Sequence, residues 1–282
     1  MNKLSADKKV QVVAALVEGC SVRSVARLTG VAKSTILRLL AEVGTACAEY
    51  QNMALQNVPA KRIQIDEIWS FVGAKQKNVT PEMAAERFCG DAWTFVAIDA
   101  DTKLVISWQV GNRDTAAATE FVGDVAARLA NRVQLTTDGH NMYLKAVADT
   151  LFENGIDFAQ LVKYYDNTPE GQKRYSPAQC MGCKKTSILG DPDPKHISTS
   201  YIERQNLTMR MNMRRFTRLT NGFSKNIENH MHMVALNYMY YNFVRVHQTL
   251  KTTPAVAAGV SAKAWTLADV VELAEIREQL AA

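Results

Sequence analysis

The chain has 282 residues, 47% hydrophobic and 22% charged, a composition typical of a globular protein with a sizeable core. It has no run of about eighteen apolar residues and no N-terminal secretion pattern, which argues against membrane-embedded and secreted classes. Its five cysteines are odd in number and mostly scattered, unlike a disulfide framework. These observations predict a cytoplasmic protein without a membrane partner.

The net charge of +5 is concentrated in two zones of the chain. Residues 1–40 hold seven Lys or Arg and two acids, and residues 198–251 hold eight and two. Because Lys and Arg neutralise phosphates, two basic surfaces of this kind favour contact with a nucleic acid. The alternative interpretation is that both zones are ordinary solvated faces.

The N-terminal part of the chain has the pattern of short helices joined by tight turns. Apolar side chains recur at helical spacing within 6–18, and Ser21 is placed to cap a second helix that ends before Gly30. A third helix is predicted over 33–43. Two helices around a glycine-containing turn are typical of a helix-turn-helix domain, whose later helix enters the major groove.

Basic and hydroxyl side chains occupy the expected DNA-facing part of this unit. They can donate hydrogen bonds to phosphates or to base edges. The competing interpretation is a plain three-helix bundle without a nucleic-acid ligand. The candidate DNA-binding residues are Arg23, Arg27, Lys33, Ser34, Thr35 and Arg38.

From residue 62 the hydrophobic period changes to that of β-strands. The predicted order is three strands, a helix, a strand, a helix, a strand and a long helix. This alternation predicts an α/β fold with a mixed sheet flanked by helices, and the order matches the ribonuclease-H-like arrangement. The ranges are a strand at 62–73, a hairpin at 93–111, a helix at 114–131, a strand at 132–139, a helix at 143–152, a strand at 158–165 and a helix containing Glu203.

The chain divides into four predicted parts. Within the third part, residues 166–197 are a proline-rich, loop-like insertion. The insertion contains Cys180 and Cys183, with His196 as a conceivable third zinc ligand, but no second pair completes the usual four-ligand site. The parts are a helix-turn-helix DNA-binding domain (1–48), a linker (49–61), a ribonuclease-H-like catalytic domain (62–252) and a C-terminal helical segment (253–282).

Three acids stand at positions that can converge in such a sheet. Asp66 interrupts an apolar strand, Asp138 ends another strand, and Glu203 lies near the start of the long helix. Mg²⁺ prefers carboxylate oxygens, and two ions about 3.5–4 Å apart serve phosphoryl transfer. Clustered acids repel one another until a cation neutralises them, so the three predict a site for two Mg²⁺ or Mn²⁺ ions. Asp99 and Asp101, at the predicted hairpin, are further candidates.

Each acid also has a plainer interpretation. Ser200 and Glu203 match a capping box, and Asp138 lies in a sequence typical of a turn. Asp66 could pair with a buried arginine, which would leave Glu67 as the ligand. Alternation along a strand puts these two neighbours on opposite faces, and Asp66 is the favoured ligand.

The segment around Glu203 is otherwise basic. No other acid occurs between Asp193 and Glu228. A lone carboxylate among cations suits a metal ligand beside a DNA-backbone surface. The residues expected to contact the backbone there are Arg204, Arg210 and Arg214.

The ordered set Asp66, Asp138 and Glu203 resembles the acid triad of DDE transposases from bacterial insertion sequences. Arg210, seven residues after the glutamate, matches the basic residue that these enzymes place two helical turns on. The segments YIERQNLTMRMNMRRFTRLTNGFSKNIENH and YNFVRVHQTLKTTPA resemble the insertion-sequence-one group. The resemblance covers most of residues 1–258, although the 65-residue gap between the second and third acids is longer than in many relatives.

This resemblance implies a metal-dependent enzyme with Asp66, Asp138 and Glu203 as catalytic metal ligands. Such an enzyme binds terminal inverted repeats, nicks the transposon ends and joins the freed 3′-hydroxyls to target DNA. The implied partners are double-stranded DNA and further copies of the chain in a homo-oligomer.

Two other functions fit parts of the pattern. A helix-turn-helix DNA-binding regulator with an inactive ribonuclease-H-like domain would need residues 1–48 and would be indifferent to the three acids. A ribonuclease-H-like nuclease would hydrolyse DNA without joining it.

Overall fold

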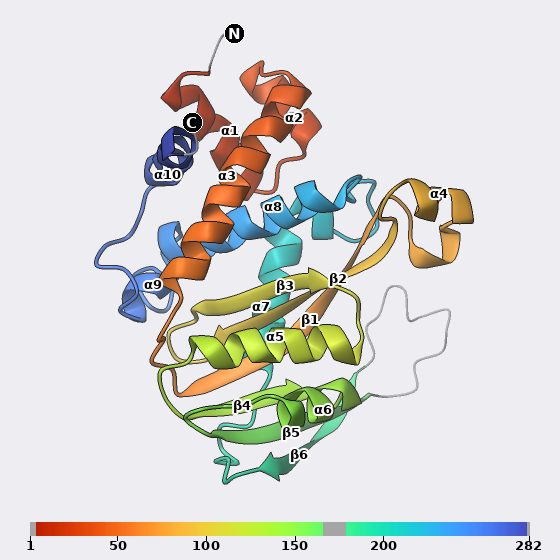
Figure 1. Cartoon of the computed structure of the whole chain (residues 1–282), viewed down its shortest axis with the longest axis vertical. Coiled ribbons are helices and arrows are strands. Elements are labelled where there is room, and N and C mark those ends of the chain that lie inside the picture. Colours follow the sequence, from red (N-terminus) through yellow and green to blue (C-terminus); the bar gives the residue numbers. More distant parts are fainter. Residues whose placement is uncertain (1–3, 166–178, 281–282) are drawn as a thin grey trace.

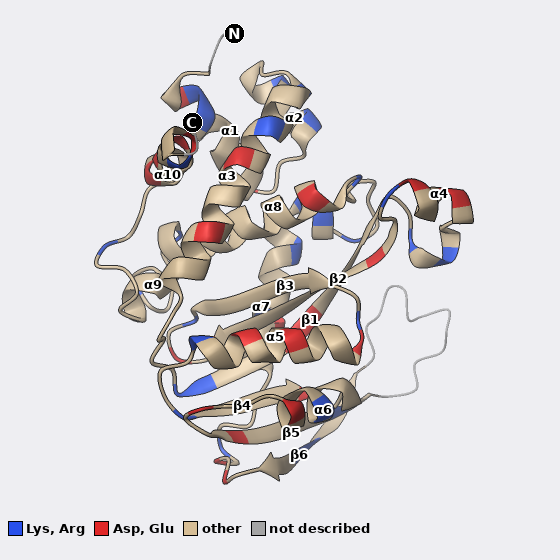
Figure 2. Cartoon of the chain, in the orientation of Figure 1, with Lys and Arg blue, Asp and Glu red and all other residues tan. Residues whose placement is uncertain are grey.

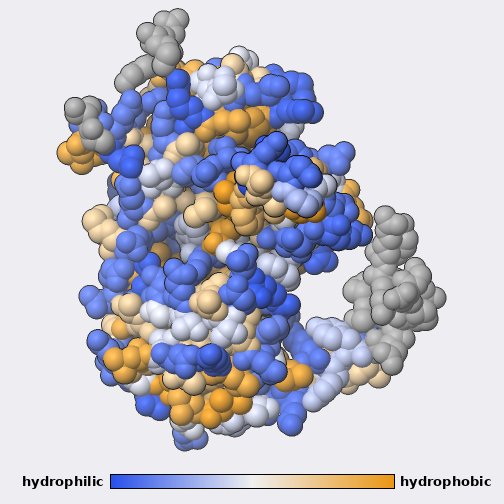
Figure 3. Space-filling view, turned by 45° about the vertical axis from the view of Figure 1, so that its right-hand side comes forward, coloured by the Kyte–Doolittle hydropathy of each residue, from blue (hydrophilic) through white to orange (hydrophobic). Residues whose placement is uncertain are grey.

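The computed structural model of the protein describes residues 4–165 and 179–280. Within that part of the chain, helices from the N-terminal and C-terminal regions pack together into one unit. This unit lies beside one mixed sheet, which has helices on its two faces (Figure 1). None of the described helices is long and apolar enough to cross a lipid bilayer. The face turned forward in Figure 3 is largely hydrophilic, and its apolar groups form separate patches.

The three predicted N-terminal helices are present. The Ser21 side chain caps the second by accepting a hydrogen bond from the Ser24 amide. Gly30 ends that helix at φ 72°, a left-handed conformation that glycine adopts without strain. The fully buried Ile36 fills the space between these helices and the rest of the core. Their bounds are α1 (Ala6–Val17), α2 (Val22–Thr29) and α3 (Lys33–Ala54).

The third helix is longer than its apolar spacing predicts. The pattern predicts an end near residue 43, whereas α3 has 22 residues and takes in residues 49–54 of the predicted linker. Its second half crosses α8 (Ile227–Met239) closely. A Cβ added at Gly44 would lie 2.5 Å from the Cβ of His232. Tertiary packing against α8, which no local pattern reveals, therefore extends the helix.

Six strands of the described chain form one sheet in the order β3-β2-β1-β4-β5-β6. The first three strands are antiparallel neighbours, β4 and β5 run parallel to β1, and β6 pairs antiparallel with β5. This is the mixed, ribonuclease-H-like sheet that the sequence predicts. The bounds are β1 (Arg62–Val72), β2 (Gly90–Asp99), β3 (Val105–Gly111), β4 (Val133–Asp138), β5 (Ile156–Tyr165) and β6 (Cys180–Leu189).

The prediction that residues 166–197 form a loop is wrong for the part that forms β6. Residues 166–178 lie outside the described chain. Nearly every side chain of β6 is exposed, so the strand has no alternating apolar face to indicate it. Among the described residues, Cys180 and Cys183 belong to no group with metal-ligand spacing.

Helices cover both faces of the sheet (Figure 1). On one face lie α5 (Thr115–Arg128) and α6 (Asn141–Asp149), and on the other lie α7 (Ser200–Asn212) and α8. The C-terminal helix α10 (Leu267–Leu280) packs against α1 and α3, and the Thr266 hydroxyl caps it by accepting a hydrogen bond from the Asp269 amide. The short helices are α4 (Pro81–Glu86), in a segment for which the sequence predicts no element, and α9 (Pro254–Ala257).

Candidate active site

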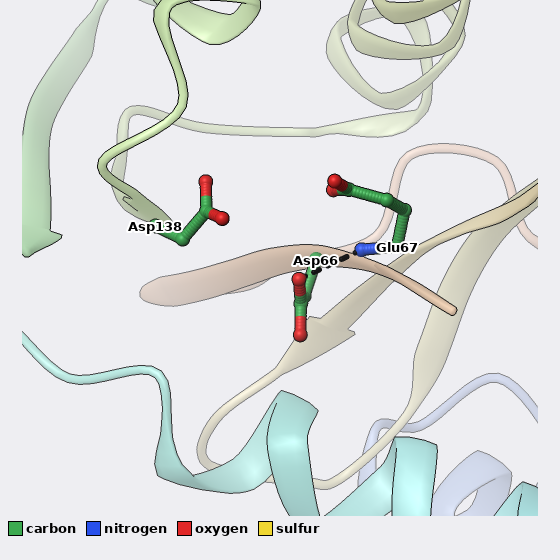
Figure 4. A group of neighbouring side chains, drawn as sticks. All are labelled: Asp66, Glu67 and Asp138. Atoms are coloured by element: carbon green, nitrogen blue, oxygen red, sulfur yellow. Dashed lines mark hydrogen bonds between the residues drawn. The ribbon is translucent and has the colours of Figure 1, made fainter. Parts of the chain in front are cut away.

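The acidic residues gather where two neighbouring parallel strands separate. β1 and β4 pair only along 62–64 and 134–136. Asp66 lies just beyond the last paired residue of β1, and Asp138 is the last residue of β4. One carboxylate oxygen each of Asp66, Glu67 and Asp138 lie within 4.8 Å of one another (Figure 4). The sheet therefore brings two of the three predicted acids together.

Asp66 has no cationic partner among the described residues. Its Oδ1 accepts a hydrogen bond from the Glu67 amide, and its Oδ2 accepts one from Nδ2 of Asn206, both at 2.9 Å. Burial raises the pKa of Asp66 to about 7, and the negative charges of Glu67, Asp138 and Glu203 act in the same direction. A carboxylate in this environment is stabilised by a bound cation.

Glu67 lies on the opposite side of the β1 ribbon, as strand alternation predicts (Figure 4). Its side chain is only 1% exposed, and its oxygens accept hydrogen bonds from Arg113 at 2.5 Å and from the Tyr143 hydroxyl at 2.8 Å. Burial, together with the nearby Glu67 charge, raises the pKa of Tyr143 well above its usual value. Glu67 is thus the acid that meets an arginine, the role that the plainer interpretation gives to Asp66.

Asp138 forms the turn that leads into α6. Its Oδ1 accepts a hydrogen bond from the His140 amide at 3.0 Å, and the His140 ring accepts one from the Met142 amide. Oδ2 of Asp138 accepts no hydrogen bond from the described residues. Asp138 therefore forms the predicted turn and still has one carboxylate oxygen available to bind a metal.

Glu203 lies on α7 and is outside the group of three. Its carboxylate accepts hydrogen bonds from Oγ1 of Thr199, at 2.6 Å, and from the Lys163 ammonium on β5. The predicted capping box with Ser200 is not formed, because α7 begins after Thr199 and Glu203 bonds to that residue instead. The charge of Glu203 still contributes to the raised pKa of Asp66.

The further candidates at the hairpin have structural partners. The Asp99 carboxylate accepts hydrogen bonds from the amides of Asp101 and Thr102 and so shapes the turn between β2 and β3. Asp101 forms an ion pair with Arg62. Neither aspartate belongs to the described acidic group.

The predicted DNA-facing side chains of the N-terminal unit are mostly exposed. Figure 2 shows Lys and Arg along α2 and at the nearby end of α3. Arg38 lies 3.6 Å from Glu42 in an exposed ion pair, which solvent screens strongly. The exposed candidates are Arg23, Arg27, Lys33, Ser34 and Arg38, and Thr35 is half-exposed.

The basic residues of α7 and the turn after it have no acidic partner in the described part of the chain. Arg204 and Arg214 are exposed. Arg210 is half-buried and donates a hydrogen bond to the carbonyl oxygen of Phe216 at 3.3 Å. Burial, with the positive charge of Arg218 acting in the same direction, lowers the pKa of Arg210 to about 10.

The sequence patterns do not identify four of the side chains that surround the acids. These are Arg113, Tyr143, Lys163 and Asn206. Each contacts an acid that is distant in sequence. Only Asn206 carried a signal, because it lies three residues after Glu203 and therefore on the same face of a helix.

Comparison with known proteins gives remote likenesses. No protein-family model and no curated protein matches the chain. A piggyBac transposase synaptic complex with hairpin DNA is 13% identical with a TM-score of 0.42, over 98% of this chain and 72% of that chain. The Mos1 strand transfer complex and a Mos1 paired-end complex with left transposon end are 15% and 18% identical, each with a TM-score of 0.24.

The two Mos1 matches take in 56% of this chain and 59% and 60% of the Mos1 chains. Likenesses of this size do not carry a function from those transposases to this protein. The functional conclusion therefore depends on the chemistry of the site itself.

Proposed function

We propose that the protein is a DDE-type DNA transposase, similar to those of the insertion-sequence-one group. It would bind the terminal inverted repeats of a mobile element, cleave the DNA there and transfer the freed strand to a target. The observation that carries this proposal is the meeting of Asp66 and Asp138 at the separating ends of two parallel strands, where no Lys or Arg of the described chain pairs with Asp66.

The donor atoms fit Mg²⁺ or Mn²⁺, which prefer oxygen ligands. Oδ2 of Asp138 has no described hydrogen-bond partner, and the buried Oδ1 of Asn206 has none either. Asp66 and Asp138 would hold the metal, and Glu203 would complete the set of catalytic acids. Two such ions, when bound, activate an attacking oxygen and stabilise a leaving one in phosphoryl transfer.

The neighbours of the acids would keep them in place for this chemistry. Asn206 orients Asp66 through its hydrogen bond, and Lys163 and Thr199 hold the Glu203 carboxylate. Arg113 neutralises the charge of Glu67, and the Tyr143 hydroxyl donates a hydrogen bond to the same carboxylate. The remaining uncompensated charge is then concentrated on Asp66 and Asp138.

Two basic surfaces would hold the DNA. Residues 1–48 would read the inverted repeat through α3, and the α7 arginines would contact the backbone near the acids. The linker 49–61 and the C-terminal segment 253–282 would complete the domain arrangement. The active form would be a homo-oligomer acting on DNA in the cytoplasm.

A strand-transfer assay with Mg²⁺ or Mn²⁺ tests the proposal. We expect Asp138→Asn and Glu203→Gln to lose cleavage and joining together, by about 100-fold or more, while still binding repeat DNA. Glu153→Gln, at an exposed acid beyond the end of α6, is the control and should behave as wild type.

The rival functions give different results in the same assay. If Glu203→Gln cleaves and joins as well as wild type, the assignment of the third acid is wrong. Wild-type protein that cleaves without joining would be a nuclease. Repeat binding without either reaction would leave the DNA-binding regulator.

A further inference from the structure

Beyond the acids, β1 continues into a groove whose aromatic side chains have no role in the proposed function. The groove has a volume of about 560 Å³ and lies between the end of β1 and the segment that follows α7. Trp69, one of its walls, is three residues after Asp66, which is about 10 Å along the strand and on the opposite face of β1. The residues that define it are Trp69, Phe71, Phe223, Arg210, Arg215 and Arg218.

Three aromatic rings form a continuous surface in this groove. The Trp69 and Phe71 ring centroids are 5.6 Å apart, and Phe71 stacks on Phe223 at 4.6 Å. All three side chains are partly exposed, and the Lys75 ammonium lies 5.7 Å from the Trp69 centroid. Accessible rings beside cations are the surface on which unpaired bases stack.

Two guanidinium groups in the groove lack a counter-charge. Arg215 donates to Oγ of Ser224 at 3.1 Å and Arg210 donates to a backbone carbonyl oxygen, but neither meets an acid in the described chain. Burial lowers the pKa of both to about 10. A cation held out of water is costly unless an anion pairs with it, and a phosphate suits a guanidinium.

A buried network keeps this wall of the groove in place. Oγ of Ser224 is 2.8 Å from Nδ1 of His230, and the other ring nitrogen is 3.4 Å from Oγ of Ser70 on β1. Burial lowers the pKa of His230 to about 3, so the ring is neutral and adds no charge beside Arg215. The groove is therefore formed before any ligand arrives.

We infer that the groove binds an unpaired nucleotide of a DNA strand, its base against the row of rings formed by Trp69, Phe71 and Phe223 and its phosphate at Arg210 and Arg215. The inference rests on the proposed function for the identity of the polyanion. In a duplex the faces of each base are covered by its neighbours, so rings inside a groove select a nucleotide outside the stack.

Binding of two labelled oligonucleotides to the full-length protein in EDTA tests this inference. One is a single-stranded octathymidylate, and the other has the same phosphates with abasic tetrahydrofuran units. By fluorescence anisotropy we expect wild type to prefer the thymidylate by roughly fivefold or more. Phe223→Leu and Trp69→Leu should remove this preference, and Phe88→Leu, at an exposed ring outside the groove, should keep it. Arg210→Gln should weaken both oligonucleotides equally.

Equal wild-type affinity for the two oligonucleotides would overturn the inference, and so would a preference that survives in Phe223→Leu. Photo-crosslinking of an oligonucleotide containing 5-iododeoxyuridine to the unaltered protein gives a second test that needs no variant. Crosslinks should fall in 69–71 or 216–223, and crosslinks elsewhere would contradict the assignment. Because no divalent metal is present, these results are independent of cleavage, and a protein that transposes normally could still fail them.

Discussion

Nδ2 of Asn206 donates a hydrogen bond to Oδ2 of Asp66 at 2.9 Å, and this contact ties α7 to β1. Asn206 is one helical turn after Glu203, so both residues lie on the same side of α7. The orientation of the third acid relative to the first therefore depends on an amide that carries no charge.

Asn206→Leu should lower metal-dependent cleavage by about tenfold or more, because a ligand without its supporting hydrogen bond is poorly oriented. Repeat binding should be unchanged, since Asn206 is buried on the face of α7 that is turned toward β1. Thr208→Ala, on the same helix, is a control, because its hydroxyl bonds only to the α7 backbone. Single-turnover cleavage with a metal titration measures the effect. Unaltered kinetics in Asn206→Leu would show that the contact does not position Asp66.

The raised pKa of Asp66 predicts that metal binding depends on pH. The ion takes the deprotonated carboxylate, so a proton must leave Asp66 on binding. With a pKa of about 7, the apparent affinity for Mn²⁺ should rise about tenfold from pH 6 to pH 8. Calorimetric titration at the two pH values measures this change. A flat affinity in wild type would mean that Asp66 is not a ligand.

The same shift affects the metal-free stability. The folded pKa lies above the unfolded value of about 3.9, so the folded protein retains a proton that the unfolded chain loses between about pH 4 and pH 7. The contribution of Asp66 to stability therefore falls as pH rises through this window. Asp66→Asn should raise the melting temperature by a few degrees at pH 8 and by little at pH 4. Thermal unfolding in EDTA at both pH values decides this.

Glu67→Leu should act in the opposite direction from Asp66→Asn, although the two acids are neighbours on one strand. It removes the carboxylate that pairs with Arg113 and accepts from Tyr143, and leaves a partly buried cation alone. We expect a loss of about 2–4 kcal/mol in the free energy of unfolding, measured with urea. A variant as stable as wild type would show that the pair contributes nothing net.

The close crossing of α3 and α8 predicts that Gly44→Ala destabilises the protein. The new Cβ would lie 2.5 Å from the Cβ of His232 and 2.7 Å from its carbonyl oxygen, so the helices must move apart. A cost of about 1–3 kcal/mol is expected in urea unfolding. Gly123→Ala on α5 is the matched control, with no atom within 4 Å of its added Cβ, and should be neutral or slightly stabilising. Equal stability of the two variants would contradict the crossing.

The sheet was predictable because β1 to β5 contain short runs of mostly buried apolar residues bounded by turn residues, which is typical of strands inside a sheet. β6 and α4 were missed because their side chains are mostly exposed, so they carry no such pattern. Asp66 and Asp138 stood out as charges in or at the end of apolar strands. The partners of the acids could not be predicted, because contacts such as Arg113 with Glu67 join residues that are distant in sequence and leave no local pattern.

The unbroken length of α3 gives the molecule a mechanical property. From Lys33 to Ala54 the helix is about 33 Å long, with no hinge between the end that would read DNA and the end packed on α8. One inserted residue would turn the outer end by about 100° and advance it by about 1.5 Å, whereas seven would nearly restore the phase. In the proposed enzyme, the length and helical phase of α3 would therefore set how many base pairs separate the recognised sequence from the cut.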